Sequence, residues 1–450
     1  MITETVAKFI VNTNYEHIEP EVIDRAKHAV LDFLGVTLAG SLETAGKVIA
    51  EYAREANSKA EAAIIGKGFK AYAPIAALSN GTMAHSLDYD DTCHSWPGHP
   101  TAVILPAVLA LGERHRRPGK EILEAYIIGF EVGSKIGLAV GKHLRRIGWH
   151  NTGTIGSIAA AAAAAKLLRL NPQQTRTALG VSASLASGLV QNFGTMTKPL
   201  HAGNGARNGV IAALLAEKGF TAHENILEEK QGFCNVLGGA REYELEVDKL
   251  GNPWDIMASG IGFKPYPSCR GTHCAIDAAL ILHEEHHFNP GDIASVECIV
   301  GPMQSQILLY PRPQTGLQGK FSLEYCVSVA LLEGKVHLKH FTDEEVLRPE
   351  VQKFLSKVGR TIPSGLDAAT RGYPQTVVVR LQDGKEFPHT VMDDMSKGSP
   401  DNPMAVEELH SKYRECARLV LKPEQAEQAL SVVSNLESLQ DISQLMEILT

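Results

Sequence analysis

The chain has 450 residues, of which 44% are hydrophobic and 21% are charged, and its formal net charge is −8. This composition is that of an ordinary globular protein with enough apolar residues for a large core. The negative net charge argues against a protein that binds nucleic acid or an anionic membrane surface. A small anionic ligand would therefore need a local pocket of positive charge.

The cysteines and the N-terminus bear on the compartment. The seven cysteines are scattered and form no C-x-x-C pair, which predicts free thiols in a reducing environment. No basic segment followed by a long apolar run stands at the N-terminus, so we expect no signal peptide. The alanine run at 159–165 is too short to span a bilayer. We expect a cytoplasmic protein.

Helical patterns fill the first 260 residues. Apolar side chains recur at helical spacing behind a proline in residues 20–34. Residues 152–170 include seven consecutive alanines, whose small side chains suit a helix packed tightly on several sides. Asn171 and Pro172 then predict the capped start of another helix. Further helices are expected over 100–112 and 121–141.

The pattern changes after Trp254. Two β-branched runs, 295–300 and 376–381, have the length of strands, and the Asp-Gly pair at 383–384 predicts a hairpin. Helices are expected between these strands and again near the C-terminus, over 271–286, 321–332, 343–358, 406–421 and 423–436.

These elements predict a mainly α protein with two domains. We expect a large all-α helical domain built from both chain ends, residues 1–264 and 398–450, and an inserted smaller α+β lid domain over 265–397. The turn-rich segment 397–403 marks the second boundary.

Residues 85–101 are the most informative stretch for function. They contain three aspartates at 88, 90 and 91 and three histidines at 85, 94 and 99. Carboxylates so close together repel one another, so at least one of them should have a perturbed pKa. A solvated acidic turn is the alternative interpretation. The neighbouring histidines and the Trp-Pro-Gly turn favour a catalytic or ligand-binding site.

Two further segments carry candidate polar groups. His150 stands at a glycine-flanked helix entrance, where it could face a cleft or merely cap the helix. Lys198, His201 and Arg207 lie beside glycines, which favours a carboxylate site over a solvent-facing loop. The glycine spacing at 203–209 is not the dinucleotide fingerprint and no strand precedes it, so we reject a nucleotide site.

The segment 263–270 lies at the expected domain junction, where ligands often bind. Lys264 and Arg270 in this segment could clamp a polycarboxylate; a rigid proline-rich linker is the alternative.

Two formal motif matches are rejected. Residues 283–287 satisfy H-E-x-x-H, but they close a helix, where histidines complement the helix dipole, and no third zinc ligand is evident. Residues 88–91 match the D-x-D-D pattern of some terpene cyclases. Those enzymes line their cavities with aromatic rings, whereas this chain has only 6% aromatic residues.

Taken together, the segments resemble the MmgE/PrpD family over essentially the whole chain. That family includes 2-methylcitrate dehydratase, cis-aconitate decarboxylase and iminodisuccinate epimerase. The matching motifs are His85-Ser-Leu-Asp88-Tyr-Asp-Asp91-Thr92, His99-Pro100, Gly148-Trp149-His150, Thr197-Lys198-Pro199-Leu200-His201 and Phe263-Lys264-Pro265. The resemblance implies a homodimer with a helical domain and an α+β lid, and no metal or organic cofactor.

The resemblance also assigns site residues. By position, a decarboxylase site of the family would comprise Asp88, Thr92, His99, His150, Lys198, Lys264 and Tyr310. The loop from Thr92 to His99 is one residue longer than in a family decarboxylase, so the choice between His94 and His99 stays open. Several segments resemble the epimerase branch most, so the resemblance does not fix the reaction.

We therefore expect a cofactor-independent lyase, a decarboxylase or dehydratase, acting on a small di- or tricarboxylate. Such reactions create a carbanion-like centre beside a carboxylate, which Lys198 and Lys264 could offset. His99 is the expected acid/base residue, with Asp88 orienting it and His150 second. The expected substrate-binding residues are Thr92, Asp91, His201, Arg207, Arg270 and Tyr310. An epimerase of an N-substituted dicarboxylate and a non-catalytic carboxylate-binding protein are the alternatives.

Overall fold

The computed structural model describes residues 1–239, 243–366 and 372–450. The chain forms two compact units, whose boundaries the sequence pattern placed near 264/265 and 397/398. The first unit comprises residues 1–192, 196–263 and 405–450, and the second comprises residues 193–195 and 264–404. Helices predominate in the described residues, which confirms the prediction of a mainly α protein.

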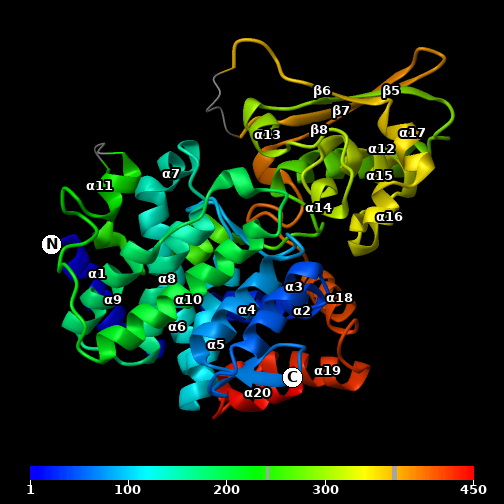
Figure 1. Cartoon of the computed structure of the whole chain (residues 1–450). Helices are drawn as coiled ribbons and strands as arrows, with labels where there is room; N and C mark the ends of the chain where they lie inside the picture. Colours follow the sequence, from blue (N-terminus) through cyan, green and yellow to red (C-terminus); the bar gives the residue numbers. More distant parts are fainter. Residues whose placement is uncertain (240–242, 367–371) are drawn as a thin grey trace. The chain divides into compact units, whose positions relative to one another are not determined.

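The first unit, here called the helical unit, contains both chain termini (Figure 1). Its helices are α1 (Ile2–Asn12), α2 (Pro20–Gly40), α3 (Thr44–Glu55), α4 (Ala73–His85), α5 (Thr101–His115), α6 (Gly119–Ile136), α7 (Lys142–Arg146), α8 (Asn151–Leu167), α9 (Pro172–Leu185), α10 (Thr197–Glu217), α11 (Phe233–Gly238), α18 (Val406–Ala417), α19 (Pro423–Ser434) and α20 (Ser443–Ile448).

Helix α8 occupies the middle of this unit and packs against α5, α6 and α10. Its alanines allow close approach: a Cβ added at Gly209 of α10 would lie 2.5 Å from the Cβ of Ala160, and one at Gly129 of α6 would lie 2.8 Å from the Cβ of Ala163. The tight packing expected from the alanine run is therefore observed. Asn171 caps the following helix α9 by accepting a hydrogen bond from the amide of Gln174.

The C-terminal helices complete the helical unit from the other end of the sequence. Helix α18 packs along α2 (Figure 1), so closely that a Cβ added at Gly35 would lie 3.2 Å from the Cα of Tyr413. This packing brings residues more than 300 positions apart into contact.

Two short antiparallel pairs of strands add to the helices of this unit. They are β1 (Ala62–Ile64) with β2 (Phe69–Ala71), and β3 (Thr92–Cys93) with β4 (Ile261–Gly262). No single helix among the described residues is long and apolar enough to cross a membrane. Helices α2 and α3, which meet at a bend, would together be long and apolar enough by length and composition alone. Most of α2 is buried within the protein, however.

The second unit consists of a four-stranded sheet and helices packed on it. The sheet order is β6-β5-β7-β8, parallel between β5 and β6 and otherwise antiparallel. Helix α12 contacts β7 and β8, and α15 contacts β6. The elements are α12 (His273–His286), β5 (Ile293–Ile299), α13 (Pro302–Ile307), α14 (Gly316–Gly319), α15 (Leu323–Glu333), α16 (Asp343–Val346), α17 (Pro349–Leu355), β6 (Val358–Thr361), β7 (Gln375–Leu381) and β8 (Glu386–Val391).

The expected hairpin at 383–384 joins β7 to β8, with Gly384 in the left-handed region at φ 86°. The single helix expected over 343–358 is wrong. Two short helices, α16 and α17, stand there instead, because Pro349 lacks an amide hydrogen and begins a new helix.

Candidate active site

The aspartate loop, residues 86–92, follows directly on helix α4. The helix ends at His85, and the amide of Asp88 donates a 3.3 Å hydrogen bond to the His85 carbonyl. Asp88 has a φ of 52°, in the left-handed region that aspartate tolerates better than most residues. This turn sends the three carboxylates of the loop to different partners.

Asp88 faces a lysine and a histidine. Lys198, the second residue of α10, places its Nζ 2.9 Å from Asp88 Oδ1. The Nε2 atom of His99 lies 3.8 Å from the same oxygen. All three residues are buried, and a buried ammonium is stable only when a carboxylate pairs with it. A substrate carboxylate could therefore share or take over Lys198 from Asp88.

Asp90 lies between two imidazoles. His85 Nδ1 is 2.9 Å and His99 Nδ1 is 3.2 Å from Asp90 Oδ2. Burial favours the neutral form of this carboxyl, but electrostatic attraction to His85 and His99, together with their hydrogen bonds, holds the pKa of Asp90 well below its ordinary value. Burial, which outweighs the attraction of Asp90, lowers the pKa of His85 to about 3. At neutral pH an ionised Asp90 thus accepts a hydrogen bond from a neutral His85.

The contacts of His99 show which of its two ring nitrogens carries a hydrogen. Its Nδ1 is 2.9 Å from the Asp91 carbonyl oxygen as well as close to Asp90, and both partners accept hydrogen bonds. Nδ1 must therefore carry a hydrogen. Nε2, on the Asp88 side, is then the atom of His99 that can gain or lose a proton.

Asp91 points to a different part of the unit. Its Oδ2 accepts a 2.7 Å hydrogen bond from Thr101, whose hydroxyl is 2.7 Å from the Tyr126 hydroxyl. Burial and the adjacent charge of Asp90 raise the pKa of Asp91 well above its ordinary value. The expectation of a perturbed carboxyl in this loop is confirmed twice, since the pKa values of Asp90 and Asp91 move in opposite directions.

His150 and His201 form a second imidazole pair. His150 precedes α8 as its N-cap residue, and its Nδ1 lies 3.0 Å from Nδ1 of His201. Burial and the nearby Lys198 lower the pKa of His150 well below its ordinary value and that of His201 to about 4. Both rings are neutral at pH 7, so one Nδ1 donates to the other. The His150 ring centre lies 6.5 Å from that of His99.

The structure distinguishes His94 from His99, the two acid/base candidates between which the sequence left the choice open. The amide of His99 donates to Thr152 Oγ1 at 3.1 Å, and the amide of Cys93 donates to the Gly98 carbonyl. His94, in contrast, is exposed. Thr92 is half-buried on β3, paired with Gly262. This geometry favours His99 over His94 as the acid/base candidate.

Four of these residues have the chemistry of metal ligands. Within the part of the chain that the structure describes, donor atoms of His85, Asp88, Asp90 and His99 lie within 4.8 Å of one another. The ammonium of Lys198 already neutralises Asp88, however, and it would repel a divalent cation placed there. The cluster could hold a metal only at the cost of this ion pair, so we retain the expectation that none is needed.

Three of the expected site residues belong to the second unit. Lys264 is its buried first residue after the chain leaves the helical unit. Arg270 donates a 3.0 Å hydrogen bond to the Lys397 carbonyl, and burial lowers the pKa of its guanidinium. The hydroxyl of Tyr310 donates to the Phe193 carbonyl at 3.3 Å.

Arg207 lies on α10 of the helical unit, and the H-E-x-x-H segment belongs to the second unit. Arg207 follows Lys198 by nine residues on α10, which turns it to the opposite side of the helix, and no described contact joins it to the cluster. His283 bonds the Leu331 carbonyl through Nδ1, and His287 is the left-handed C-cap of α12. The segment therefore closes a helix, as expected.

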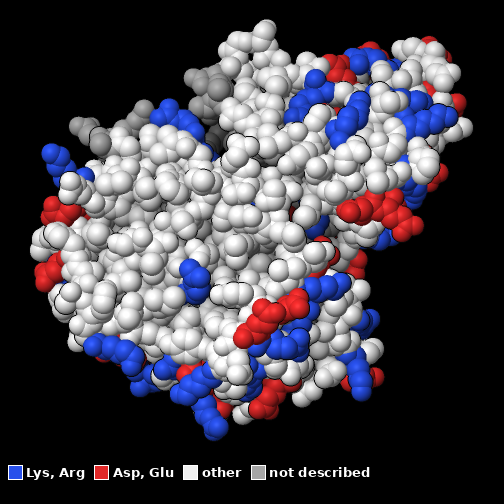
Figure 2. All heavy atoms as spheres, viewed as in Figure 1, with Lys and Arg blue, Asp and Glu red and all other residues white. Residues whose placement is uncertain are grey.

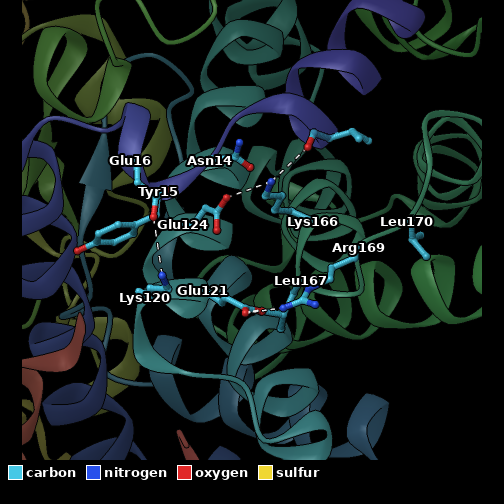
Figure 3. A pocket seen from close by; sticks show the side chains of 11 residues that line it. Asn14, Tyr15, Glu16, Lys120, Glu121, Glu124, Lys166, Leu167, Arg169 and Leu170 are labelled. Atoms are coloured by element: carbon cyan, nitrogen blue, oxygen red, sulfur yellow. Dashed lines mark hydrogen bonds and ion pairs between the residues drawn. The ribbon is translucent and has the colours of Figure 1, made fainter. Parts of the chain in front are cut away.

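A cavity of about 360 Å³ lies elsewhere in the helical unit, and the charged side chains that line it form ion pairs (Figure 3). Lys166 lies 3.0 Å from Glu124 and also donates to the carbonyls of Val11 and Thr13. Arg169 lies 2.7 Å from Glu121. Each of these cations pairs with a carboxylate, and none of the expected site residues is among the residues that line the cavity.

Sequence reasoning assigned no role to several groups of the cluster. His85 and Asp90 stood in the quoted motif, and their pairing could have been suspected from a histidine that ends a helix five residues before an aspartate. Thr101 and Tyr126 carried no such signal, because polar side chains on apolar helices have many possible partners. Lys412 also contacts the loop, through the Tyr89 carbonyl, from the other end of the chain.

The chain matches two known domain families in order. Residues 4–246 match the MmgE/PrpD N-terminal domain, and residues 266–438 match the MmgE/PrpD C-terminal domain. The family resemblance drawn from the motifs is confirmed.

Relatives of established name align over long stretches. The whole chain is 30% identical to the cis-aconitate decarboxylase of Homo sapiens, covering 94% of that protein, and 29% identical to that of Mus musculus, covering 93%. The mitochondrial 2-methylcitrate dehydratase of Yarrowia lipolytica is 25% identical over 72% of the chain and 65% of its own length. These relatives are lyases.

Proposed function

The chain belongs to the MmgE/PrpD family, and we propose that it is a cofactor-independent lyase acting on a small di- or tricarboxylate. The observation that carries the proposal is the buried cluster in which Lys198, Asp88 and His99 meet. A cation for a substrate carboxylate thus stands beside an imidazole whose Nε2 can exchange a proton. Lyase-type function also agrees with the relatives that align with the chain.

Lys198 offsets negative charge in this mechanism. Loss of CO₂ or of a proton beside a carboxylate leaves an electron pair on carbon, and a fixed ammonium in a dry site stabilises that charge. Lys198 is held in place by Asp88 before substrate arrives, so little reorganisation is needed. The family resemblance gives Lys264 the same role, and we keep it as part of the proposal.

His99 moves the proton. In decarboxylation the bond between carbon and the departing carboxylate breaks, CO₂ leaves, and the electron pair on carbon takes a proton from Nε2 of the imidazolium. In dehydration the neutral Nε2 removes the proton beside the carboxylate, and the imidazolium so formed gives this proton to the departing hydroxyl group, which leaves as water. The bonds from Nδ1 to Asp90 and to the Asp91 carbonyl hold the ring in one orientation throughout.

Decarboxylation of cis-aconitate is the first reaction to assay, because the decarboxylase relatives align with the whole chain. Purified protein is incubated separately with cis-aconitate, 2-methylcitrate and iminodisuccinate, with CO₂ release and the products followed by NMR. We expect turnover of one of these acids to an unsaturated product. Failure of all three to react would contradict the substrate class.

An epimerase is the second candidate, and one observation favours it. Inversion at carbon needs two proton-transfer groups, and His150 is a second buried imidazole whose ring centre lies 6.5 Å from that of His99. In deuterated water an epimerase would exchange the proton beside the carboxylate without net elimination. A lyase would give an unsaturated product instead.

We also propose a cytoplasmic homodimer. Four exposed apolar side chains, Leu138, Ile147, Leu189 and Val236, stand on the neighbouring segments around α7 and α11. Figure 2 shows few charged side chains over α9 and α10 of the same unit. A second copy would cover such a surface. The seven cysteines are free thiols, which supports a reducing compartment.

A further inference from the structure

Lys412 reaches the aspartate loop from helix α18. Its Nζ donates a 2.7 Å hydrogen bond to the Tyr89 carbonyl and lies 4.0 Å from the centre of the Tyr89 ring. The same Nζ is 2.6 Å from Asp32 Oδ1 on α2. All three residues are buried. One ammonium therefore ties two packed helices to the residue that stands between Asp88 and Asp90.

The Tyr89 peptide controls where the neighbouring carboxylates point. Asp88 precedes it in a left-handed conformation, which costs free energy unless the surroundings hold it. Asp90 follows it and bonds two histidines. Rotation of the peptide between them would move both carboxylates, and a charge-assisted hydrogen bond to its carbonyl resists that rotation.

The anchor itself is rigid. Lys412 and Asp32 sit on helices that approach closely, since a Cβ at Gly35 would lie 3.2 Å from the Cα of Tyr413. Asp32 neutralises the ammonium and fixes its position, and the Tyr89 ring covers it. The geometry thus supplies a fixed donor at one point of the aspartate loop.

We propose that Lys412 and Asp32 are positioning residues for the active site, because their ion pair locks the Tyr89 carbonyl and so aims Asp88 at Lys198 and Asp90 at His85 and His99. This inference rests on the proposed function, since positioning matters only if the aspartate loop takes part in the reaction. Among the described contacts, those of Lys412 and Asp32 are with one another and with Tyr89, and none is with Lys198 or His99.

The test compares two double variants, each of which replaces an ion pair by two neutral side chains. D32N/K412M removes the anchor. E124Q/K166M is the matched control, because Lys166 also pairs with a buried acid and donates to backbone carbonyls, but in the cavity of Figure 3. Both double variants replace a buried pair without leaving a lone charge, so both should fold. Far-UV circular dichroism and urea unfolding check this.

Two readouts are specific to positioning. We expect kcat of D32N/K412M to fall roughly 10- to 100-fold with KM changed less than about threefold, since misaimed groups lose transition-state contacts. In protein labelled with [13Cε1]histidine, the resonances of His85 and His99 should shift in D32N/K412M. Both readouts should stay at wild-type values in E124Q/K166M.

Wild-type kcat and resonances in folded D32N/K412M, or equal changes in both double variants, would overturn the positioning role. If D32N/K412M does not fold, Asp32→Asn alone should shift the same two resonances by less, and unchanged resonances would overturn the proposal. The resonances need no substrate. Absence of turnover by wild type would therefore refute the proposed function without deciding the positioning role.

Discussion

Two groups of charge in the helical unit differ in how their charges are matched. Around Lys166, the ammonium pairs with Glu124, and the exposed guanidinium of Arg169 pairs with Glu121. Around Asp88, the ammonium of Lys198 pairs with one of three neighbouring carboxylates, and four histidines lie in the same buried region. There the pKa of Asp90 falls, that of Asp91 rises, and the imidazoles of His85, His150 and His201 stay neutral. Complete pairing stabilises a fold, whereas divergent pKa values mark groups able to exchange protons.

Removal of His99 should have the largest effect on activity. We expect His99→Ala to lower kcat roughly 10²–10⁴-fold with substrate affinity within several-fold, because a proton-transfer group acts mainly in the transition state. Steady-state kinetics on the turned-over acid measure both quantities. His94→Ala, at the exposed histidine of the same loop, is the control and should keep wild-type rates. The reverse pattern would reassign the proton transfer to His94.

Loss of Lys198 should weaken binding as well as turnover. A cation that faces a carboxylate acts in the ground state and the transition state alike, so Lys198→Ala should lower kcat/KM by roughly 10²–10³-fold with a higher KM. Lys166→Ala removes an ammonium that also pairs with a carboxylate, but in the matched group. It should cost stability but leave kcat/KM within about twofold. Equal kinetic losses in both variants would erase the distinction between the two regions.

The histidines near Asp88 should also make the free energy of unfolding decrease at acidic pH. The pKa of His201 is about 4 in the folded protein because of burial, below the ordinary 6.5 of an unfolded chain. The unfolded state therefore binds the proton first, and stability is lost as pH falls from 6.5 toward 4, by at most about 3 kcal/mol from this residue. Urea unfolding at several pH values measures the loss, and His201→Gln should flatten the slope. An unchanged slope would mean that His201 does not titrate in this way.

Metal removal should have the smallest effect. Because Lys198 stands where a cation would compete for Asp88, we expect activity to be unaffected by EDTA and elemental analysis to find no stoichiometric zinc or iron. One tightly held metal per chain, lost together with activity, would transfer the charge-stabilising role from lysine to the ion.

The sequence predicts the helices and the family far better than it predicts the partners of single side chains. Helical periodicity, the alanine run and the Asn171 cap come from local patterns, and α2, α8 and α9 form where those patterns stand. The motif around Asp88 likewise points to the loop in which buried carboxylates and histidines gather. The pairing of Lys412 with Tyr89 joins residues 323 positions apart, which no local pattern encodes.

The direction of each carboxyl in the loop depends on tertiary structure for the same reason. Asp91 was grouped with the substrate-binding residues, yet its hydrogen bond goes to Thr101, because the left-handed turn at Asp88 separates the neighbouring side chains. The opposed pKa shifts of Asp90 and Asp91 follow from that separation. The close spacing of the aspartates predicts that at least one pKa is perturbed, but neither which one nor in which direction.

The central claim is that the cluster around Asp88, rather than the matched charges around Lys166, receives the carboxylates of the substrate. A crystal structure of the protein soaked with a citrate-like tricarboxylate tests it most directly. We predict a ligand carboxylate within about 3 Å of Lys198 Nζ, the distance of a charge-assisted hydrogen bond, with its carbon skeleton beside His99 Nε2. A ligand found in the cavity of Figure 3, with the cluster unchanged, would contradict the account.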